Sequence, residues 1–371
     1  MNTSFWLDKR VLITGHTGFK GSWLALWLQR LGATVVGYAL PPSGTHSLFL
    51  SASVGNAMTS VFADIRDQAA LQKLIDRFKP EVVFHLAAQP LVRKSYAEPR
   101  LTYEVNVLGT VHLLEAVRRS RSCRVVVNVT SDKCYENLEQ GREFREIDPL
   151  GGHDPYSSSK GCAELVTAAY RRSFFTTLTD RRVGVATARA GNVIGGGDFS
   201  ADRLIPDFIT ALRAHTPLQV RHPHAIRPWQ HVLEPLAGYL MLAEKLWHEP
   251  GRYSCAWNFG PRKEDARSVQ WIVTTLSELC GEPLGWRVDG AQQLHEAAHL
   301  TLDSSKARRE LQWQPRWTLE RALRAVVEWH RAYDTNPATH DVVLRQIACY
   351  DATPLPTMQL EHQPHLREVT C

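Results

Sequence analysis

Two hydrophobic patterns take turns along the first half of the chain. Short β-branched runs such as RVLITG from Arg10 and EVVFHLAA from Glu81 are typical of buried strands. Between them apolar residues recur at helical spacing, as Leu24, Trp27 and Leu28 do. Strands are predicted at 10–15, 34–40, 81–88, 124–130 and 183–189, and helices at 21–31, 67–79 and 155–172. Strands that alternate with helices predict an α/β Rossmann fold, a doubly wound parallel sheet.

The alternation stops near residue 190, where glycines and prolines mark loops. Helical patterns return at 203–215, 232–248 and 318–333. We expect residues 1–190 to form the sheet domain, with segments near 230–260 returning to it. Residues 191–338 are expected to form a smaller, partly interleaved substrate-binding domain. The polar stretch 339–371 is expected to be a mobile tail.

The composition, 44% apolar and 22% charged, is that of a globular protein. No apolar run of roughly 18 residues occurs, so no membrane span is expected. Seven scattered cysteines without a CxxC motif favour reduced thiols in the cytoplasm. A net charge of +5 without a basic block argues against nucleic acid. His222 and His224 lack Cys or carboxylate partners at metal-site spacing, so no metal is expected.

A glycine loop with the spacing GxxGxxG follows the first predicted strand and opens the first helix. Such a loop lets the backbone approach a pyrophosphate at a helix N-terminus, where free N–H groups favour an anion. A glycine-rich turn that only packs a helix on a sheet is the alternative. The candidate dinucleotide ligands in the loop are Gly15, His16, Thr17, Gly18, Phe19, Lys20 and Gly21.

Two features of the cofactor region are unusual or incomplete. Lys20 occupies a position that is usually apolar, where it could contact a phosphate or point into solvent. The second strand ends in Tyr38-Ala39-Leu40, without the acidic residue that binds a ribose, so this position does not separate NAD from NADP. Asp64 and Ile65, after the third strand pattern, are candidates for the adenine edge.

Tyr156 and Lys160 form a YxxxK pair at the start of a predicted helix. Residues at i and i+4 share a helix face, so the lysine ammonium lies beside the phenol. A phenol with a pKa near 10 is a poor base at neutral pH, and a nearby ammonium and a nicotinamide ring would favour its phenolate. Thr130-Ser131 ends a strand between the glycine loop and this pair.

This order of motifs resembles the extended short-chain dehydrogenase/reductase family, in a match that runs from residue 9 to residue 197. The resemblance implies that Ser131 holds a sugar hydroxyl, that Tyr156 takes its proton and that Lys160 anchors the nicotinamide ribose of NAD. FHLAAQ from Phe84 resembles the family's cofactor-lining strand, and the residues implied there are Leu86, Ala87, Ala88, Gln89 and the sheet-capping Asn106.

The residues after Ser131 separate the reactions within this family. Epimerases have small neutral residues there, whereas nucleotide-sugar 4,6-dehydratases commonly have Thr-Asp-Glu. Loss of water across carbons 5 and 6 requires an acid for the leaving hydroxyl and a base for the carbon 5 proton. Asp132 could be the acid, and Lys133 could be the base if its pKa were lowered. A surface turn is the alternative for the pair.

Further motifs, among them GHTGFKGSWL from Gly15 and RPWQHVLEP from Arg227, resemble the dehydratases that act on CDP-sugars. The match extends to about residue 333 and implies a CDP-sugar substrate and a 4-keto-6-deoxy product. The candidates for substrate binding, mainly at its diphosphate, are Arg189, Asn192, Arg203, Leu204 and Arg227. Each arginine could equally be an ordinary surface charge.

Three rival functions remain open on the sequence. They are a nucleotide-sugar epimerase, a dehydratase for another nucleotide and a dinucleotide sensor without catalysis. An intact Ser131, Tyr156 and Lys160 speaks against the sensor. The resemblance also implies a homodimer, formed through a four-helix contact that includes the helix of Tyr156 and Lys160. We expect Ala163, Val166, Ala169 and Tyr170 near that contact.

Overall fold

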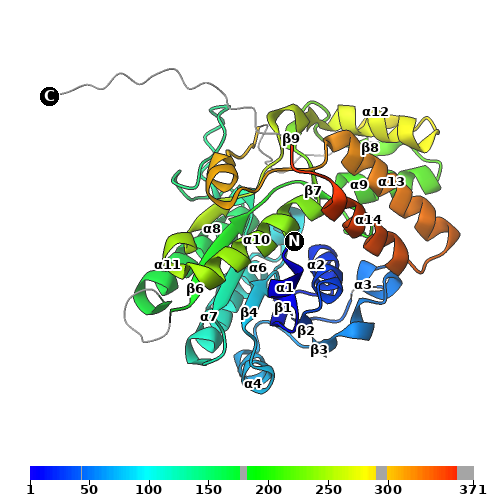
Figure 1. Ribbon diagram of the computed structural model, residues 1–371. Coiled ribbons are helices and arrows are strands. Elements are labelled where there is room, and N and C mark those ends of the chain that lie inside the picture. Colours follow the sequence, from blue (N-terminus) through cyan, green and yellow to red (C-terminus); the bar gives the residue numbers. More distant parts are fainter. Residues whose placement is uncertain (43, 176–181, 290–298, 357–371) are drawn as a thin grey trace.

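A seven-stranded parallel sheet forms the centre of the protein, described here from a computed structural model (Figure 1). The structure describes residues 1–42, 44–175, 182–289 and 299–356. The strands lie in the order β11-β6-β5-β4-β1-β2-β3. Their bounds are β1 Arg10–Thr14, β2 Thr34–Ala39, β3 Thr59–Phe62, β4 Val82–His85, β5 Val125–Val129, β6 Gly184–Arg189 and β11 Ala256–Asn258. The predicted Rossmann fold is therefore confirmed.

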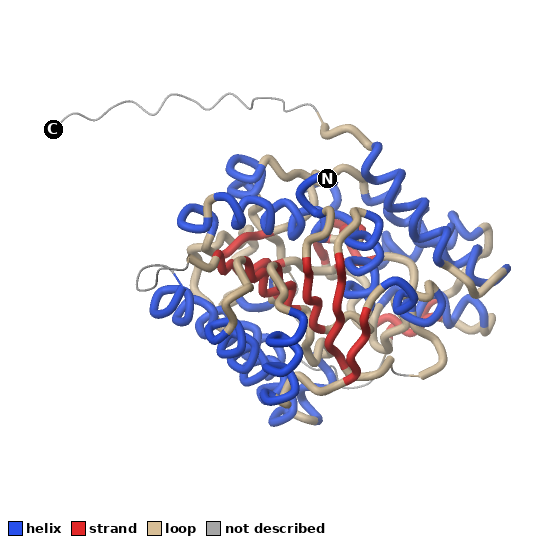
Figure 2. The backbone as a smooth tube through the Cα atoms, turned by 60° about the horizontal axis from the view of Figure 1, so that its bottom comes forward, coloured by secondary structure: helices blue, strands red, loops and turns tan. Residues whose placement is uncertain are grey.

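Helices cover both faces of this sheet, as the tube view shows (Figure 2). Along β1, Val11 and Ile13 face one hydrophobic core and Leu12 faces the other, as the two-residue period of a strand requires. The first core includes α2 (Phe19–Arg30) and α10 (Leu233–His248). The second includes α4 (Gln68–Phe78), α7 (Gly109–Arg119) and part of α8 (Pro155–Tyr170). Burial on both faces explains the almost continuous apolar runs of the strands.

Local signals set the ends of several elements. The Asp67 side chain accepts a hydrogen bond from the backbone N–H of Ala70 and so caps the N-terminus of α4. Asp154 caps α8 in the same way, with Pro155 in the first turn, and this fixes where the YxxxK helix begins. The shorter helices are α1 Thr3–Trp6, α3 Leu48–Ser51, α5 Val92–Ala97, α6 Pro99–Tyr103 and α11 Pro250–Tyr253.

A smaller layer of helices and strand pairs lies beyond the ends of the sheet strands (Figure 1). Its core is separate from the two cores of the sheet and contains Phe208, Ile272 and Leu323. The helices are α9 Leu204–Arg213, α12 Val269–Cys280 and α13 Leu319–Thr335. The paired strands are β7 Val193–Ile194 with β10 Gln230–His231, β8 Leu218–Val220 with β13 Trp286–Val288, and β9 Ile226–Pro228 with β12 Ala266–Ser268.

The expectation of an unstructured tail from residue 339 is wrong for its first part. Residues His340–Ala352 form α14, which packs beside α2 (Figure 1). Val343, Ile347 and Tyr350 are fully buried there, because apolar residues recur at helical spacing within a polar stretch. Residues 357–371 lie outside the described part. In the described ranges no helix is long and apolar enough to cross a membrane.

Candidate active site

The glycine loop between β1 and α2 has the geometry of a close backbone approach. Gly15 has a φ of +79°, and a Cβ on it would lie 2.7 Å from the backbone nitrogen of Ala87. A Cβ on Gly21 would collide with the carbonyl oxygen of Gly15. Gly18 caps α2 without a side chain, which leaves the first N–H groups of the helix open to an anion. The loop therefore fits a dinucleotide pyrophosphate.

Three side chains of the loop hold it in place instead of facing a ligand. His16 is fully buried, stacks on Phe62 and fills the space above Gly37. Burial lowers the pKa of His16 to about 4, so its ring is neutral at neutral pH. Thr17 Oγ1 donates to the carbonyl of Leu40 at 2.9 Å. Phe19 packs partly buried against the first core. Only the backbone of these residues is placed to meet a dinucleotide.

Lys20 is partly exposed and lines a pocket that lies apart from the backbone of the glycine loop. Together with Ser131, Asp132 and Tyr156 it lines a pocket of about 310 Å³ between the sheet and the smaller layer. Burial, followed by the charge of Arg203, lowers the pKa of Lys20 to about 7.

The two candidates for the adenine edge differ in exposure. Asp64 is partly exposed and pairs with Arg66 at 2.7 Å, a bond that lowers the pKa of Asp64. It lines a shallow pocket with Arg66, Asp67, Glu104, Leu108 and His112. Ile65 is buried and contributes to the core of the sheet, so its side chain supports this edge from below.

The loop after β4 is tied to the YxxxK helix through one amide. Asn106 accepts from the backbone N–H of Gln89 at 2.8 Å, donates to the carbonyl of Gln89 at 3.1 Å and donates to Ser159 Oγ at 2.8 Å. Leu86 and Ala87 pass beside Gly15 in this loop, and Ala88 follows them in the chain. The carboxyl end of β4 therefore brings the loop that resembles the family's cofactor-lining strand against the glycine loop.

Ser131, Tyr156 and Lys160 meet at the carboxyl end of β5. The Ser131 hydroxyl donates to Asp132 Oδ1 at 3.0 Å and is also hydrogen-bonded to the Tyr156 hydroxyl. Lys160 Nζ lies 3.5 Å from the carbonyl of Val129, which it can donate to. Burial lowers the pKa of Lys160 to about 8 and raises the pKa of Tyr156 to about 12, while the bond to Ser131 opposes the latter shift. A nearby positive charge is therefore needed to stabilise the phenolate of Tyr156.

Asp132 and Lys133 are not a surface turn. They form a short 3-10 helix after β5, and both line the pocket that Tyr156 lines. Asp132 is 2% exposed and packs against Gly191, where any side chain would collide with it. Among the described residues its Oδ2 has no hydrogen-bond partner. The carboxylate is thus buried in the pocket with one free oxygen.

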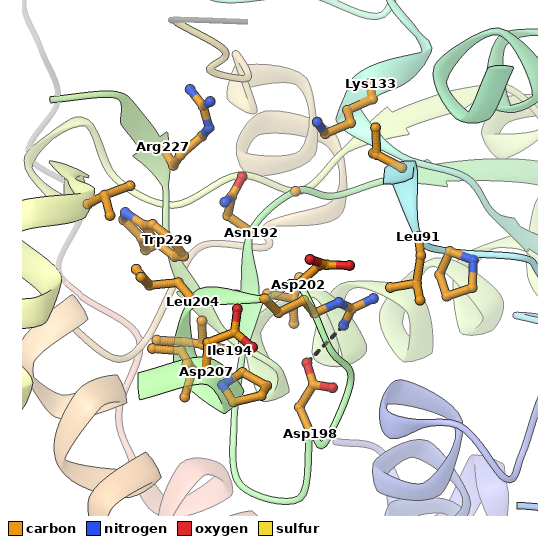
Figure 3. Close-up of a pocket in the computed structure, with 18 of the residues that line it drawn as sticks. Leu91, Lys133, Asn192, Ile194, Asp198, Asp202, Leu204, Asp207, Arg227 and Trp229 are labelled. Atoms are coloured by element: carbon orange, nitrogen blue, oxygen red, sulfur yellow. Dashed lines mark hydrogen bonds and ion pairs between the residues drawn. The ribbon is translucent and has the colours of Figure 1, made fainter. Parts of the chain in front are cut away.

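Four of the five substrate candidates line this pocket. Arg227 and Asn192 lie on the same side as Lys133, and Leu204 and Asp207 lie further down (Figure 3). Arg203 Nη1 pairs with Asp198 at 2.8 Å on the pocket wall. Cationic side chains from separate segments thus surround a cavity whose remaining walls are partly apolar.

Arg189 lies elsewhere, and the prediction that it binds substrate does not hold. It is 3% exposed and its guanidinium makes a fork with Glu164, at 2.9 Å through Nε and 2.7 Å through Nη2. Its Nη1 donates to the hydroxyl of Tyr135 at 2.7 Å. Because the donors are occupied within the protein, none is directed to the pocket.

Several pocket residues carried no recognisable signal in the sequence. Arg93 follows the β4 loop, and Asp202 and Arg221 come from loops of the smaller layer. Asp198 is the only one near a marked feature, since it directly follows the glycines at 195–197. Their convergence depends on how the smaller layer packs, which spacing along the chain does not encode.

Three features together define the class of this protein. They are a parallel sheet with a glycine loop after β1, a cluster of Ser131, Tyr156 and Lys160 at the end of β5, and a pocket under an added layer. These are the features of an extended short-chain dehydrogenase/reductase.

Comparisons with known proteins place the chain within this class. The sequence profile of the GDP-mannose 4,6 dehydratase family matches residues 12–326. The chain therefore belongs to that family. It is 52% identical over 335 residues to the CDP-glucose 4,6-dehydratase of Salmonella typhimurium, covering 90% of this chain and 93% of the relative. It is 28% identical to the dTDP-glucose 4,6-dehydratase of Xanthomonas campestris pv. campestris, over 87% of this chain and 93% of the relative.

Solved structures share the fold. A dTDP-glucose 4,6-dehydratase from Bacillus anthracis, in complex with NAD, superposes with a TM-score of 0.73 at 23% identity, over 88% of this chain and 98% of the other. The epimerase Mth375 from Methanothermobacter thermautotrophicus gives a TM-score of 0.78 at 23% identity, over 90% of this chain and 96% of the other. Because dehydratases and epimerases share this fold, the fold does not separate the two reactions.

Proposed function

We propose that the protein is an NAD-dependent CDP-glucose 4,6-dehydratase, which converts CDP-D-glucose to CDP-4-keto-6-deoxy-D-glucose. One observation carries the proposal: Asp132 and Lys133 share a pocket with Tyr156. The two charged residues stand where the epimerases that the sequence resembles have small neutral residues, and this supports a dehydratase. The 52% identity to a CDP-glucose 4,6-dehydratase over nearly the whole chain supports the choice of substrate.

NAD is the proposed cofactor, held by its pyrophosphate at the glycine loop and by its adenine beside Asp64. Lys160 and the loop from Leu86 to Gln89 would line the nicotinamide ribose. When bound, the dinucleotide accepts the hydrogen of carbon 4 and returns it at carbon 6, so that it is regenerated in each turnover. The close approach of Gly15 to Ala87, with the open N-terminus of α2, supports this placement.

Tyr156 and its neighbours begin the reaction at carbon 4. The Tyr156 oxygen removes the proton of the 4-hydroxyl, and Ser131, which is bonded to it, orients that hydroxyl. The buried phenol has a raised pKa, so Lys160 and the cofactor must favour the phenolate in the loaded enzyme. Oxidation to the 4-ketone then acidifies the carbon 5 proton.

Asp132 and Lys133 carry out the loss of water. We propose that Lys133, in its neutral amine form, takes the carbon 5 proton and that Asp132 protonates the leaving hydroxyl of carbon 6. Arg203 and Arg227, with Asn192, line the same pocket and are proposed to bind the diphosphate. The ion pair to Asp198 holds the guanidinium of Arg203 in orientation.

We propose further that the protein forms a homodimer and that it works in the cytoplasm. The exposed apolar residues Leu165 on α8, with Tyr103 and Leu108 on the neighbouring helices, suit a four-helix contact between two copies. Ala163, expected at that contact, is already buried within the protomer. We also propose the partly interleaved division into residues 1–190 and 191–338, which the separate core around Phe208, Ile272 and Leu323 supports. A monomer at micromolar concentration would contradict the dimer.

The test of the proposed reaction is a single-turnover record of enzyme-bound NADH with CDP-glucose. Asp132→Asn should still form NADH, which then persists, because water loss slows by about a hundred- to ten-thousand-fold. Tyr156→Phe should scarcely form NADH. An Asp132→Asn enzyme that dehydrates its sugar at the native rate would refute the assignment of this pair.

A further inference from the structure

Lys20 lies at a place in the fold that disfavours a cation. It is the second residue of α2, in the first turn, where the helix dipole is positive. Two other cations, Arg203 and Lys160, act on it through space and lower its pKa. A lysine in this position destabilises its own surroundings, so its presence calls for a reason outside the folding of α2.

The side chain lies beside the residues that act on the sugar. Lys20 lines the pocket with Ser131, Asp132 and Tyr156. The charged groups that act on it are Arg203, Asp132, Lys160 and Asp198. Within the described ranges, the structure gives Lys20 no ion pair within 4 Å, although two carboxylates lie in its surroundings. Its ammonium therefore lies at the sugar pocket and is not held in an ion pair.

One carboxylate oxygen of Asp132, in the same pocket, has no hydrogen-bond partner among the described residues. Its Oδ1 accepts from Ser131, whereas its Oδ2 is buried and has no partner in the described structure. Each loss of water removes a proton from the acid, so Asp132 must receive a new proton in every turnover. Lys20 is a proton-bearing group in the same pocket, and its pKa of about 7 lets it release a proton near neutral pH.

We propose that Lys20 is the source of the proton that departs with the carbon 6 hydroxyl, handed on through the free Oδ2 of Asp132. The inference rests on the proposed dehydratase function and deepens it. It assigns Lys20 to the elimination of water and not to the pyrophosphate of the cofactor.

The proton count closes within the site. Lys133 takes the carbon 5 proton, the electron pair of that C–H bond forms the double bond to carbon 6, and the C6–O bond breaks. Lys20 gives a proton to Asp132 and becomes an amine, and the leaving oxygen takes that proton from Asp132 and departs as water. Tyr156 still holds the 4-hydroxyl proton, which Ser131, bonded to both Tyr156 and Asp132, can return to the pair. Lys133 gives its proton back to carbon 5.

The experiment compares Lys20→Met and Lys20→Arg with the exposed-lysine control Lys73→Met. Each variant is mixed with NAD and CDP-glucose in a single turnover, and the affinity for NAD is titrated separately. Both Lys20 variants should form NADH and then lose water about a hundredfold or more slowly, because neither side chain can donate a proton at neutral pH. NAD affinity should stay at the wild-type value. Wild-type water loss should slow above about pH 7, and this limb should vanish in Lys20→Met.

Three results would overturn the proposal. Weaker NAD binding with a normal rate of water loss would make Lys20 a pyrophosphate ligand. Full activity of Lys20→Arg would show that only the charge matters. Absence of NADH formation in Lys20→Met would place Lys20 in the first step. Failure of the wild-type enzyme to make any 4-keto product from CDP-glucose would instead remove the proposed function itself, so the two failures are distinguishable.

Discussion

Replacing Arg189 by methionine should destabilise the fold without weakening substrate binding. The guanidinium is 3% exposed and forms a two-bond fork with Glu164, which also accepts from Thr130 and from Thr187. Methionine fills a similar volume but leaves the carboxylate of Glu164 buried with only two neutral donors. Removing one partner of a buried ion pair costs about 3–5 kcal/mol, because the other charge stays in a low dielectric.

The loss of stability in Arg189→Met should depend on pH, and this dependence identifies its cause. In the wild type, Arg189 holds the pKa of Glu164 below its usual value, so the pair contributes stability above the unfolded pKa and loses it as the pH falls. In Arg189→Met, Glu164 becomes neutral more easily in acid. The loss of stability relative to wild type should therefore be greatest near pH 8 and shrink below about pH 5.

Urea denaturation measures the free energy of unfolding, and initial rates measure KM for CDP-glucose in the folded fraction. The double variant Glu164→Gln/Arg189→Met is the matched control, since it removes the unpaired charge and should recover most of the lost stability. If KM rises strongly while the free energy of unfolding stays unchanged, Arg189 binds the diphosphate and its interpretation as an internal support is wrong.

Two further expectations concern the glycine loop and helix α14. Gly21→Ala should abolish NAD binding in a fluorescence titration, because its methyl would collide with the Gly15 carbonyl, whereas Gly251→Ala, with open space around it, should bind normally. Burial raises the pKa of Glu234, which accepts from the Tyr350 hydroxyl, to about 7. The folded state then holds a proton that the unfolded state has lost, so wild-type stability should fall as pH rises from about 4.5 to 7. Glu234→Gln should flatten that slope in urea denaturation, and an unchanged slope would contradict it.

The sheet and its motifs could be predicted because their signals are local. A strand buried on both faces shows as an apolar run, and a helix start shows as a cap such as Asp154. Helix α14 escaped prediction because prolines and polar residues surround a four-residue apolar stripe that includes Val343 and Ile347.

The misassigned and incomplete parts of the site have a different cause. Arg189 looks like an anion ligand in the sequence, but its partner Glu164 lies 25 residues away on another element, and no spacing rule joins them. Lys20 could be assigned to the loop but not to the sugar pocket, since only the packing of the smaller layer closes that pocket over it.

The most direct test incubates the protein with a small amount of NAD and, separately, with CDP-, dTDP-, UDP- and GDP-glucose. The 4-keto-6-deoxy product is followed by its absorbance in alkali. Our account predicts this product from CDP-glucose in large excess over the NAD supplied, without net accumulation of NADH. A product formed only from another nucleotide, an epimerised sugar with its 6-hydroxyl intact, or NADH formed in proportion to substrate would contradict it.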